Sequence, residues 1–131
     1  MKLNIAAVIV TFNRKELLIK CIEAVIGQTF LPQTIIIIDN ASTDGTEELL
    51  RKKGFCDGSV NGITLYYERL SKNSGGAGGF YFGIKRAQEA SYDAVWVMDD
   101  DGLPDKDCLK NMISYLGKYD YISPLVVDIK L

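Results

Sequence analysis

The chain has 131 residues, of which 47% are hydrophobic, and its formal net charge is −2. This length suits one domain with its own core, and the slight negative charge argues against nucleic acid, whose phosphates usually select basic proteins. Histidine is absent, which excludes imidazole as a general base or metal ligand and leaves carboxylates for either task.

The three cysteines, Cys21, Cys56 and Cys108, are widely spaced and include no CxxC pair. This spacing argues against a zinc site, so we expect free thiols, with Cys21 and Cys108 in the core of a protein from a reducing compartment. No signal-peptide cleavage site is evident, and no apolar run approaches the roughly 20 residues of a transmembrane helix. We therefore expect a cytoplasmic protein that associates with the membrane only through other regions or partners.

The first predicted element is a strand over residues 3–12, an unbroken apolar run typical of a strand covered on both faces. Asn13 and the glutamate three residues later have capping-box spacing, so we predict that Asn13 caps a helix ending at Gly27. A second buried strand is predicted over 34–40. A polar loop and a short helix that ends at Gly54 follow this strand.

The stretch FCDGSVNG is predicted to be a loop, and a third strand is predicted over 63–69. A helix over 79–90 then precedes a fourth strand at 92–99. A helix near 105–117 and the apolar run YISPLVV close the chain. Strands that alternate with helices predict an α/β fold, with a doubly wound, mostly parallel sheet and helices on both faces.

A polar motif follows each predicted strand; the four motifs are TFNR, DNASTDGT, NSGGAGG and DDDG. The carboxyl ends of parallel strands meet at one edge of a sheet, and ligands bind in the crevice outside that edge. The sequence therefore predicts that four loops form a single site.

The glycine-rich motif NSGGAGG includes Asn73 and Gly76. Its glycines allow close backbone approach, and the helix after it offers free N–H groups to an anion. The spacing does not match the dinucleotide fingerprint, because Tyr81 stands where a glycine is needed, and it does not match the P-loop. A flexible turn with a close contact between helix and sheet explains the motif equally well.

The motif after the second strand begins with Asp39, which can accept a hydrogen bond from a nucleotide base or a hydroxyl. Ser42, Thr43 and Asp44 belong to residue types that usually bond within turns and helix caps. We therefore take Asp39 as the candidate ligand-binding residue and the other three as turn residues.

Three adjacent carboxylates, Asp99, Asp100 and Asp101, end the fourth strand. An EF-hand is excluded because Leu103 and Pro104 stand where a donor and a glycine are required. DxDG after an apolar strand resembles the nucleophile motif of haloacid-dehalogenase-like phosphatases, but Leu103 departs from that motif and little chain remains for the later motifs of this family. A hard cation such as Mg²⁺ or Mn²⁺ would neutralise the cluster, since both ions prefer oxygen ligands.

The segments VIVTFNRKELLIKCIEAVIGQT and IIIIDNASTDGT resemble the opening of family 2 glycosyltransferases, which have the GT-A nucleotide-diphospho-sugar transferase fold. NSGGAGGFYFGIKRA and VWVMDDDGLPD resemble the galactofuranosyl- and rhamnosyltransferase-like branch. The resemblance implies an inverting, metal-dependent enzyme of cell-surface polysaccharide synthesis. It would move a sugar from a UDP- or dTDP-sugar to a glycan or lipid-linked acceptor. A non-catalytic nucleotide-binding module and a DxD phosphohydrolase are the alternatives.

The resemblance also assigns residues. It places the first loop at the base and ribose, Asp39 at the base, the glycine-rich loop along the nucleotide and its sugar, and the aspartates at hydroxyls and metal. The donor-binding set is Thr11, Asn13, Arg14, Asp39, Asn73, Gly76, Asp99 and Asp100. Asp99 and Asp101 would reach a Mn²⁺ or Mg²⁺ ion.

Family 2 members continue well beyond the aspartate motif, and their later half carries the acceptor site and the carboxylate that deprotonates the acceptor. We therefore expect residues 1–131 to be the donor-binding part of a GT-A domain, with the general base beyond residue 131.

Overall fold

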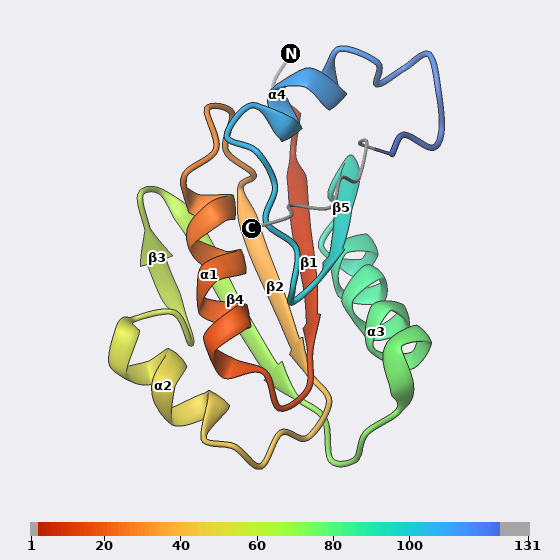
Figure 1. Ribbon diagram of the computed structural model, residues 1–131. Helices are drawn as coiled ribbons and strands as arrows, with labels where there is room; N and C mark the ends of the chain where they lie inside the picture. Colours follow the sequence, from red (N-terminus) through yellow and green to blue (C-terminus); the bar gives the residue numbers. More distant parts are fainter. Residues whose placement is uncertain (1–2, 124–131) are drawn as a thin grey trace, which may run out of the picture.

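The computed structural model describes residues 3–123 (Figure 1). The described strands are β1 (Ile5–Thr11), β2 (Thr34–Asp39), β3 (Gly58–Val60), β4 (Ile63–Arg69) and β5 (Ala94–Asp99). The helices in the same range are α1 (Lys15–Ile26), α2 (Thr46–Lys53), α3 (Gly75–Glu89) and α4 (Cys108–Ile113). The run YISPLVV, predicted at the end of the chain, lies largely outside the described residues.

The strands form one sheet in the order β3-β4-β2-β1-β5. β4, β2, β1 and β5 are parallel, and only β3, at one edge, is antiparallel to its neighbour β4. The chain moves outward from β1 to β4 and then returns to the other side of β1 to form β5. The predicted α/β, mostly parallel sheet is confirmed, and the direction of winding changes between β1 and β5.

The core lies on both faces of this sheet, and every residue of β1 and β2 is buried. Alternate side chains point to opposite faces. Those of one face pack against α1 and α2, and those of the other face pack against α3 (Figure 1). In β1 the first set is Ile5, Ala7 and Ile9, and the second is Ala6, Val8 and Val10. Burial on both faces explains why the sequence shows continuous apolar runs here.

Helix α3 packs close to the sheet because it presents glycines to β1. A Cβ atom added at Gly83 would lie 2.3 Å from Cγ1 of Val8, and one at Gly79 would lie 2.6 Å from Cγ1 of Val10. These two glycines therefore allow a close contact between helix and sheet. Such a contact was one of the two explanations for the glycine-rich motif.

Two predicted helix starts are wrong. Helix α3 begins at Gly75 and not at residue 79. The side chain of Asn40 accepts from Oγ of Ser74 and donates to the carbonyl of Gly75, which holds a first turn of low helix propensity in place. The N-cap of α1 is Arg14 and not Asn13, whose φ of 51° is left-handed. Helix α4 is also shorter than predicted, at Cys108–Ile113.

The stretch FCDGSVNG contains strand β3, which the sequence prediction missed. β3 and β4 form a hairpin around Asn61 and Gly62, whose φ angles of 53° and 81° are both positive. An Asn-Gly pair is the preferred sequence for such a two-residue hairpin turn, so the signal was present.

The three cysteines are free; Cys21 and Cys56 are buried, whereas Cys108 is partly buried beside the core. Within residues 3–123, the helices are too short or too polar for any of them to traverse a bilayer.

Candidate functional site

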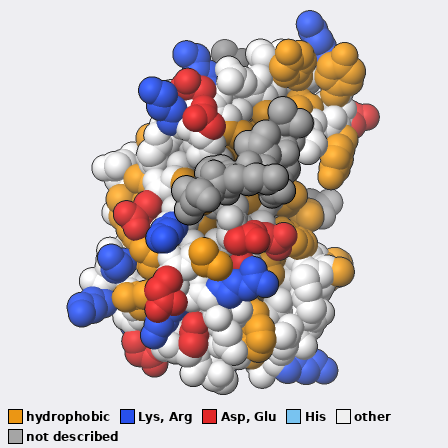
Figure 2. Space-filling view, in the orientation of Figure 1, with side chains coloured by type: hydrophobic (Ala, Val, Ile, Leu, Met, Phe, Trp, Pro, Cys, Tyr) orange, Lys and Arg blue, Asp and Glu red, His pale blue; other side chains and the backbone are white. Residues whose placement is uncertain are grey.

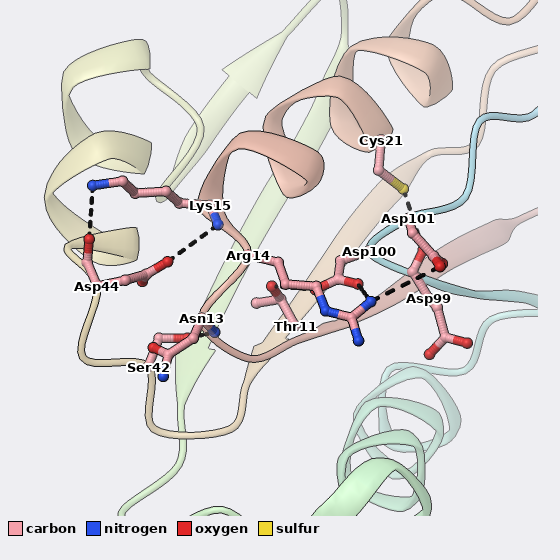
Figure 3. Close-up of polar contacts among 10 residues, drawn as sticks. All are labelled: Thr11, Asn13, Arg14, Lys15, Cys21, Ser42, Asp44, Asp99, Asp100 and Asp101. Carbon is pink, nitrogen blue, oxygen red and sulfur yellow. Dashed lines mark hydrogen bonds and ion pairs between the residues drawn. The ribbon is translucent and has the colours of Figure 1, made fainter. Parts of the chain in front are cut away.

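The predicted polar motifs gather at the carboxyl edge of the sheet. Within this edge, the winding direction changes between the neighbouring strands β1 and β5. Figure 3 shows the loop after β1, with Thr11, Asn13 and Arg14, lying between the loop after β2 and the aspartates after β5. In Figure 2 acidic and basic side chains adjoin where β5 ends in Figure 1. The expected convergence of loops on one edge is therefore present.

Asp100 joins the loop after β5 to the loop after β1. Its side chain accepts a hydrogen bond from Oγ1 of Thr11 at 2.9 Å, and Nη1 of Arg14 lies 3.3 Å from its other oxygen. The residue is only 4% exposed. Burial raises the pKa of Asp100 above its ordinary value, although Thr11 and Arg14 oppose this shift. Asp100 thus fixes two loops relative to each other.

Asp99 and Asp101, which flank it, are exposed. Asp101 has a distant ion pair with Arg14, at 3.8 Å, and the backbone carbonyl of Asp99 accepts from Sγ of Cys21 at 3.6 Å. Burial, followed by the charges of the aspartates, raises the pKa of Cys21 to about 12, so this thiol stays protonated and continues to donate. The two outer carboxylates are therefore accessible to a ligand.

The chemistry of these carboxylates fits a hard divalent cation. Among the described residues, no group of three or more acidic or thiol side chains could enclose a metal ion by itself. Mg²⁺ is commonly held by one or two carboxylates together with substrate phosphates, so two exposed aspartates suit it. A cation here would take its remaining ligands from a bound molecule and from water.

Asp39, at the end of β2, is fully buried and bonded within the protein. Its Oδ1 accepts from the backbone amide of Ser42 at 2.9 Å, and its Oδ2 accepts from the hydroxyl of Tyr67 at 2.6 Å. Burial and the adjacent carboxylate raise the pKa of Tyr67, which keeps this hydroxyl a donor. Asp39 therefore holds Ser42 and Tyr67 in place, and its side chain is not exposed at the edge of the sheet.

Asn13 connects the loops after β1 and β2. Its backbone amide donates to Oγ of Ser42 at 2.9 Å, and its Oδ1 accepts from the amide of Thr43 at 2.7 Å. Lys15 adds to the same junction, because its amide and its Nζ both donate to Asp44. Ser42, Thr43 and Asp44 were predicted to bond within their own turn and helix cap, but the contacts above run to the loop after β1. Within the described chain α2 has no side-chain cap, and of the three residues Asp44 alone makes a local side-chain bond, to the hydroxyl of Thr46.

Asn40 holds the start of α3 against the sheet. It is 3% exposed; its Nδ2 donates to the carbonyl of Gly75 at 3.0 Å, and its Oδ1 accepts from Oγ of Ser74 at 3.1 Å. The predicted site residue Asn73 is exposed, and its Oδ1 accepts from the amide of Gly75. The loop after β4 therefore reaches the same edge as the other loops.

Gly76 is also exposed and differs from the glycines deeper in α3. Its φ is not left-handed, and a Cβ added there would meet nothing within 4 Å. Neither backbone strain nor packing against the described residues requires glycine at this position.

Two residues at this edge were missed by sequence reasoning. Tyr67 contacts Asp39, and Nη2 of Arg69 donates to the carbonyl of Ser42 at 3.0 Å. Arg69 also lines a polar cavity of about 320 Å³ together with Ser42, Thr43, Gly45, Thr46, Glu47 and Glu48. The signal was available, since both residues lie at the carboxyl end of a strand that was predicted with the correct bounds.

Comparison with known proteins agrees with this architecture. A family model described as glycosyl transferase family 2 matches residues 6–130. The chain is 31% identical to the galactofuranosyltransferase GlfT1 of Mycolicibacterium smegmatis and 32% identical to GlfT1 of Mycobacterium tuberculosis, over 95% and 96% of its length. It spans 40% of the length of each of these relatives.

Two solved structures resemble the fold. The mannosyltransferase PcManGT from Pyrobaculum calidifontis, in complex with GDP-Man and Mn²⁺, has a TM-score of 0.74 at 21% identity, covering 89% of this chain and 33% of its own. S. aureus TarS 1–349 in complex with UDP has a TM-score of 0.71 at 22% identity, covering 88% and 32%. The fold is that of the GT-A glycosyltransferases, and the chain belongs to glycosyl transferase family 2.

Proposed function

We propose that residues 1–131 form the donor-binding part of an inverting glycosyltransferase, which binds a nucleotide-diphospho-sugar at the carboxyl edge of the sheet. The observation that carries this proposal is the contrast at the end of β5, where a buried Asp100 fixes the loop and Asp99 and Asp101 remain accessible. UDP- and dTDP-sugars are the proposed donors, and galactofuranose is the first sugar to test because the GlfT1 relatives are named for it.

The proposed roles follow the positions of the residues. Thr11, Asn13, Arg14 and Asp39 would surround the base and ribose, and Asn73 and Gly76 would lie along the nucleotide and sugar. Gly76 supports this assignment because its exposed backbone leaves room for a ligand where no packing requires glycine. Asp99 would bind hydroxyl groups of the donor and the metal ion. Asp100 would support the donor site from its buried position.

Asp99 and Asp101 would hold a Mn²⁺ or Mg²⁺ ion. When bound, such an ion neutralises charge that develops on a departing nucleoside diphosphate, an effect worth several kcal/mol. The protein supplies the frame for it, since Thr11 anchors Asp100, the carboxylate between the two proposed ligands.

The acceptor would be a glycan or a lipid-linked glycan of a cell-surface polysaccharide, handled in the cytoplasm at the inner face of the membrane. Transfer requires a general base near the acceptor hydroxyl. Asp39 and Asp100 are buried and bonded, and Asp99 and Asp101 are assigned to the metal, so we place the base outside residues 1–131.

Calorimetric titration with a panel of UDP-, dTDP- and GDP-sugars, with Mn²⁺ or with chelator, tests the proposal. We expect one nucleotide class to bind, more tightly with Mn²⁺. Asp101→Ala should lose the Mn²⁺-dependent part of the affinity, and its stability should stay within about 0.5 kcal/mol of the parent, as for most surface substitutions.

Asp120→Ala, which removes an exposed carboxylate elsewhere in the described chain, is the matched control and should bind as the parent does. Absence of nucleotide binding by the folded parent would reject the donor site. An Asp101→Ala variant that keeps the Mn²⁺ effect would reject the metal assignment alone. Incubation with radiolabelled donor and acceptor extract should give no glycoside, and robust product would place the base within residues 1–131.

A further inference from the structure

The guanidinium of Arg14 lies beside the carboxylates of Asp100 and Asp101, where a divalent cation would also be attracted. Its Nη1 is 3.3 Å from Oδ1 of Asp100 and 3.8 Å from Oδ2 of Asp101, and Figure 3 shows the guanidinium between these two aspartates. The Arg14 side chain is 54% exposed and that of Asp101 is 60% exposed, whereas that of Asp100 is 6% exposed. The guanidinium thus bridges a fixed carboxylate and an accessible one.

The two contacts differ in strength. Asp100 is held independently by Thr11, so its position does not depend on Arg14. The pair with Asp101 is long and exposed to solvent, and such pairs contribute little and are screened by salt. The link between Arg14 and Asp101 is therefore the one that an incoming cation breaks most easily.

We propose that Arg14 is the resident counter-ion of the aspartate cluster: a divalent cation displaces it from Asp101, and the released guanidinium then pairs with the diphosphate of the donor. This inference rests on the proposed metal and donor site; it moves the guanidinium of Arg14 from the base and ribose to the diphosphate and adds an order of events. Arg14 thereby opposes binding of the cation alone and favours binding of the cation together with the diphosphate, which a guanidinium recognises well.

The test separates these two effects by measuring Mn²⁺ alone, through water-proton relaxation at low ionic strength, and then UDP at saturating Mn²⁺ by calorimetry. Arg14→Gln should bind Mn²⁺ about two- to fivefold more tightly than the parent, the range expected from a surface ion pair. The same variant should bind UDP more weakly. Arg14→Lys, which keeps the charge, should resemble the parent in the first measurement.

Arg51→Gln is the matched control, because Arg51 forms an exposed ion pair with Glu47 on α2, outside the cluster. It should change neither affinity. General damage to the site would weaken both ligands, so the opposite signs expected for Arg14→Gln distinguish release of a counter-ion from loss of structure. The gain in Mn²⁺ affinity should also shrink as ionic strength rises.

If the parent binds Mn²⁺ and Arg14→Gln binds it equally or more weakly, the counter-ion role is wrong while the metal site stands. If Mn²⁺ binds only after Arg14 is replaced, the role is supported in its strongest form. If neither protein binds Mn²⁺ alone, the counter-ion role is wrong. The metal assignment then stands if UDP binding still depends on Mn²⁺, and it fails together with this inference if UDP binds equally well with Mn²⁺ and with chelator.

Discussion

The two sides of the polar edge are built differently. On the β2 side, Asp39 and Asn40 are buried, and their side-chain polar atoms are bonded to Ser42, Tyr67, Ser74 and Gly75. On the β5 side, Asp99 and Asp101 are exposed, and only Asp100 between them is buried. One side is completed by the protein itself, and the other leaves carboxylates accessible.

This difference separates residues that build the edge from residues that are available at it. A buried polar group must be paired, because leaving it unpaired costs about 1–3 kcal/mol. An exposed carboxylate is hydrated and needs no partner for the fold to be stable. Substitutions on the two sides should therefore differ first in the free energy of unfolding, and only second in ligand binding.

The largest effect on the free energy of unfolding is expected for Asp39→Ala, on the β2 side of the edge. The substitution leaves the amide of Ser42 and the hydroxyl of Tyr67 without their acceptor, which should lower the free energy of unfolding by about 2–4 kcal/mol. Urea unfolding measures this. It should also weaken donor binding with or without Mn²⁺. Tyr67→Phe, which removes one hydrogen bond, should cost only about 0.5–1.5 kcal/mol. Parent-like stability of Asp39→Ala would break the comparison.

The next effect is expected for Gly83→Ala in α3. Its new Cβ would overlap Cγ1 of Val8, and overpacking of this kind costs about 1–3 kcal/mol. The melting temperature should fall accordingly. The double variant Gly83→Ala, Val8→Ala makes room for the methyl group, so its loss should be smaller than the sum of the two single losses. Additive losses would show that the helix does not depend on this contact.

The smallest and most diagnostic effect is expected for Gly76→Ala in the first turn of the same helix. Nothing surrounds the new methyl group, so the variant should gain about 0.5–1 kcal/mol of stability from the better helix former. Donor affinity should nevertheless fall, because the methyl group occupies the proposed path of the nucleotide. A loss of donor affinity in a variant that is more stable than the parent cannot be attributed to unfolding. Unchanged affinity would remove Gly76 from the donor site.

Much of the fold could be predicted because the signals were local. Continuous apolar runs identified β1 and β2, and β4 was predicted with its observed bounds. The start of α3 could not be predicted, since its first glycines have low helix propensity and are held by Asn40, which lies more than 30 residues earlier in the sequence. Asn13 fits a cap by spacing, yet its side chain bonds to Thr43 instead.

The location of the site could be predicted, but the burial and bonding of its individual side chains could not. Parallel strands bring their carboxyl ends together, which was enough to gather the four motifs. Nothing in DDDG indicates which aspartate is buried, because the answer depends on Thr11 at the end of a neighbouring strand. The bonding of Asp39 likewise could not be predicted, because its side chain accepts from Tyr67, which lies 28 residues later in the chain.

The contact between α3 and β1 restricts which natural substitutions this chain can accept. Since a Cβ at position 83 would lie 2.3 Å from the side chain of Val8, these positions share one limited volume. Natural substitutions there should be correlated: a residue larger than glycine at 83 should accompany a residue smaller than valine at 8. At position 76 a Cβ would meet no atom of residues 3–123 within 4 Å, so this position escapes the pairing, and its variation should instead follow the choice of ligand.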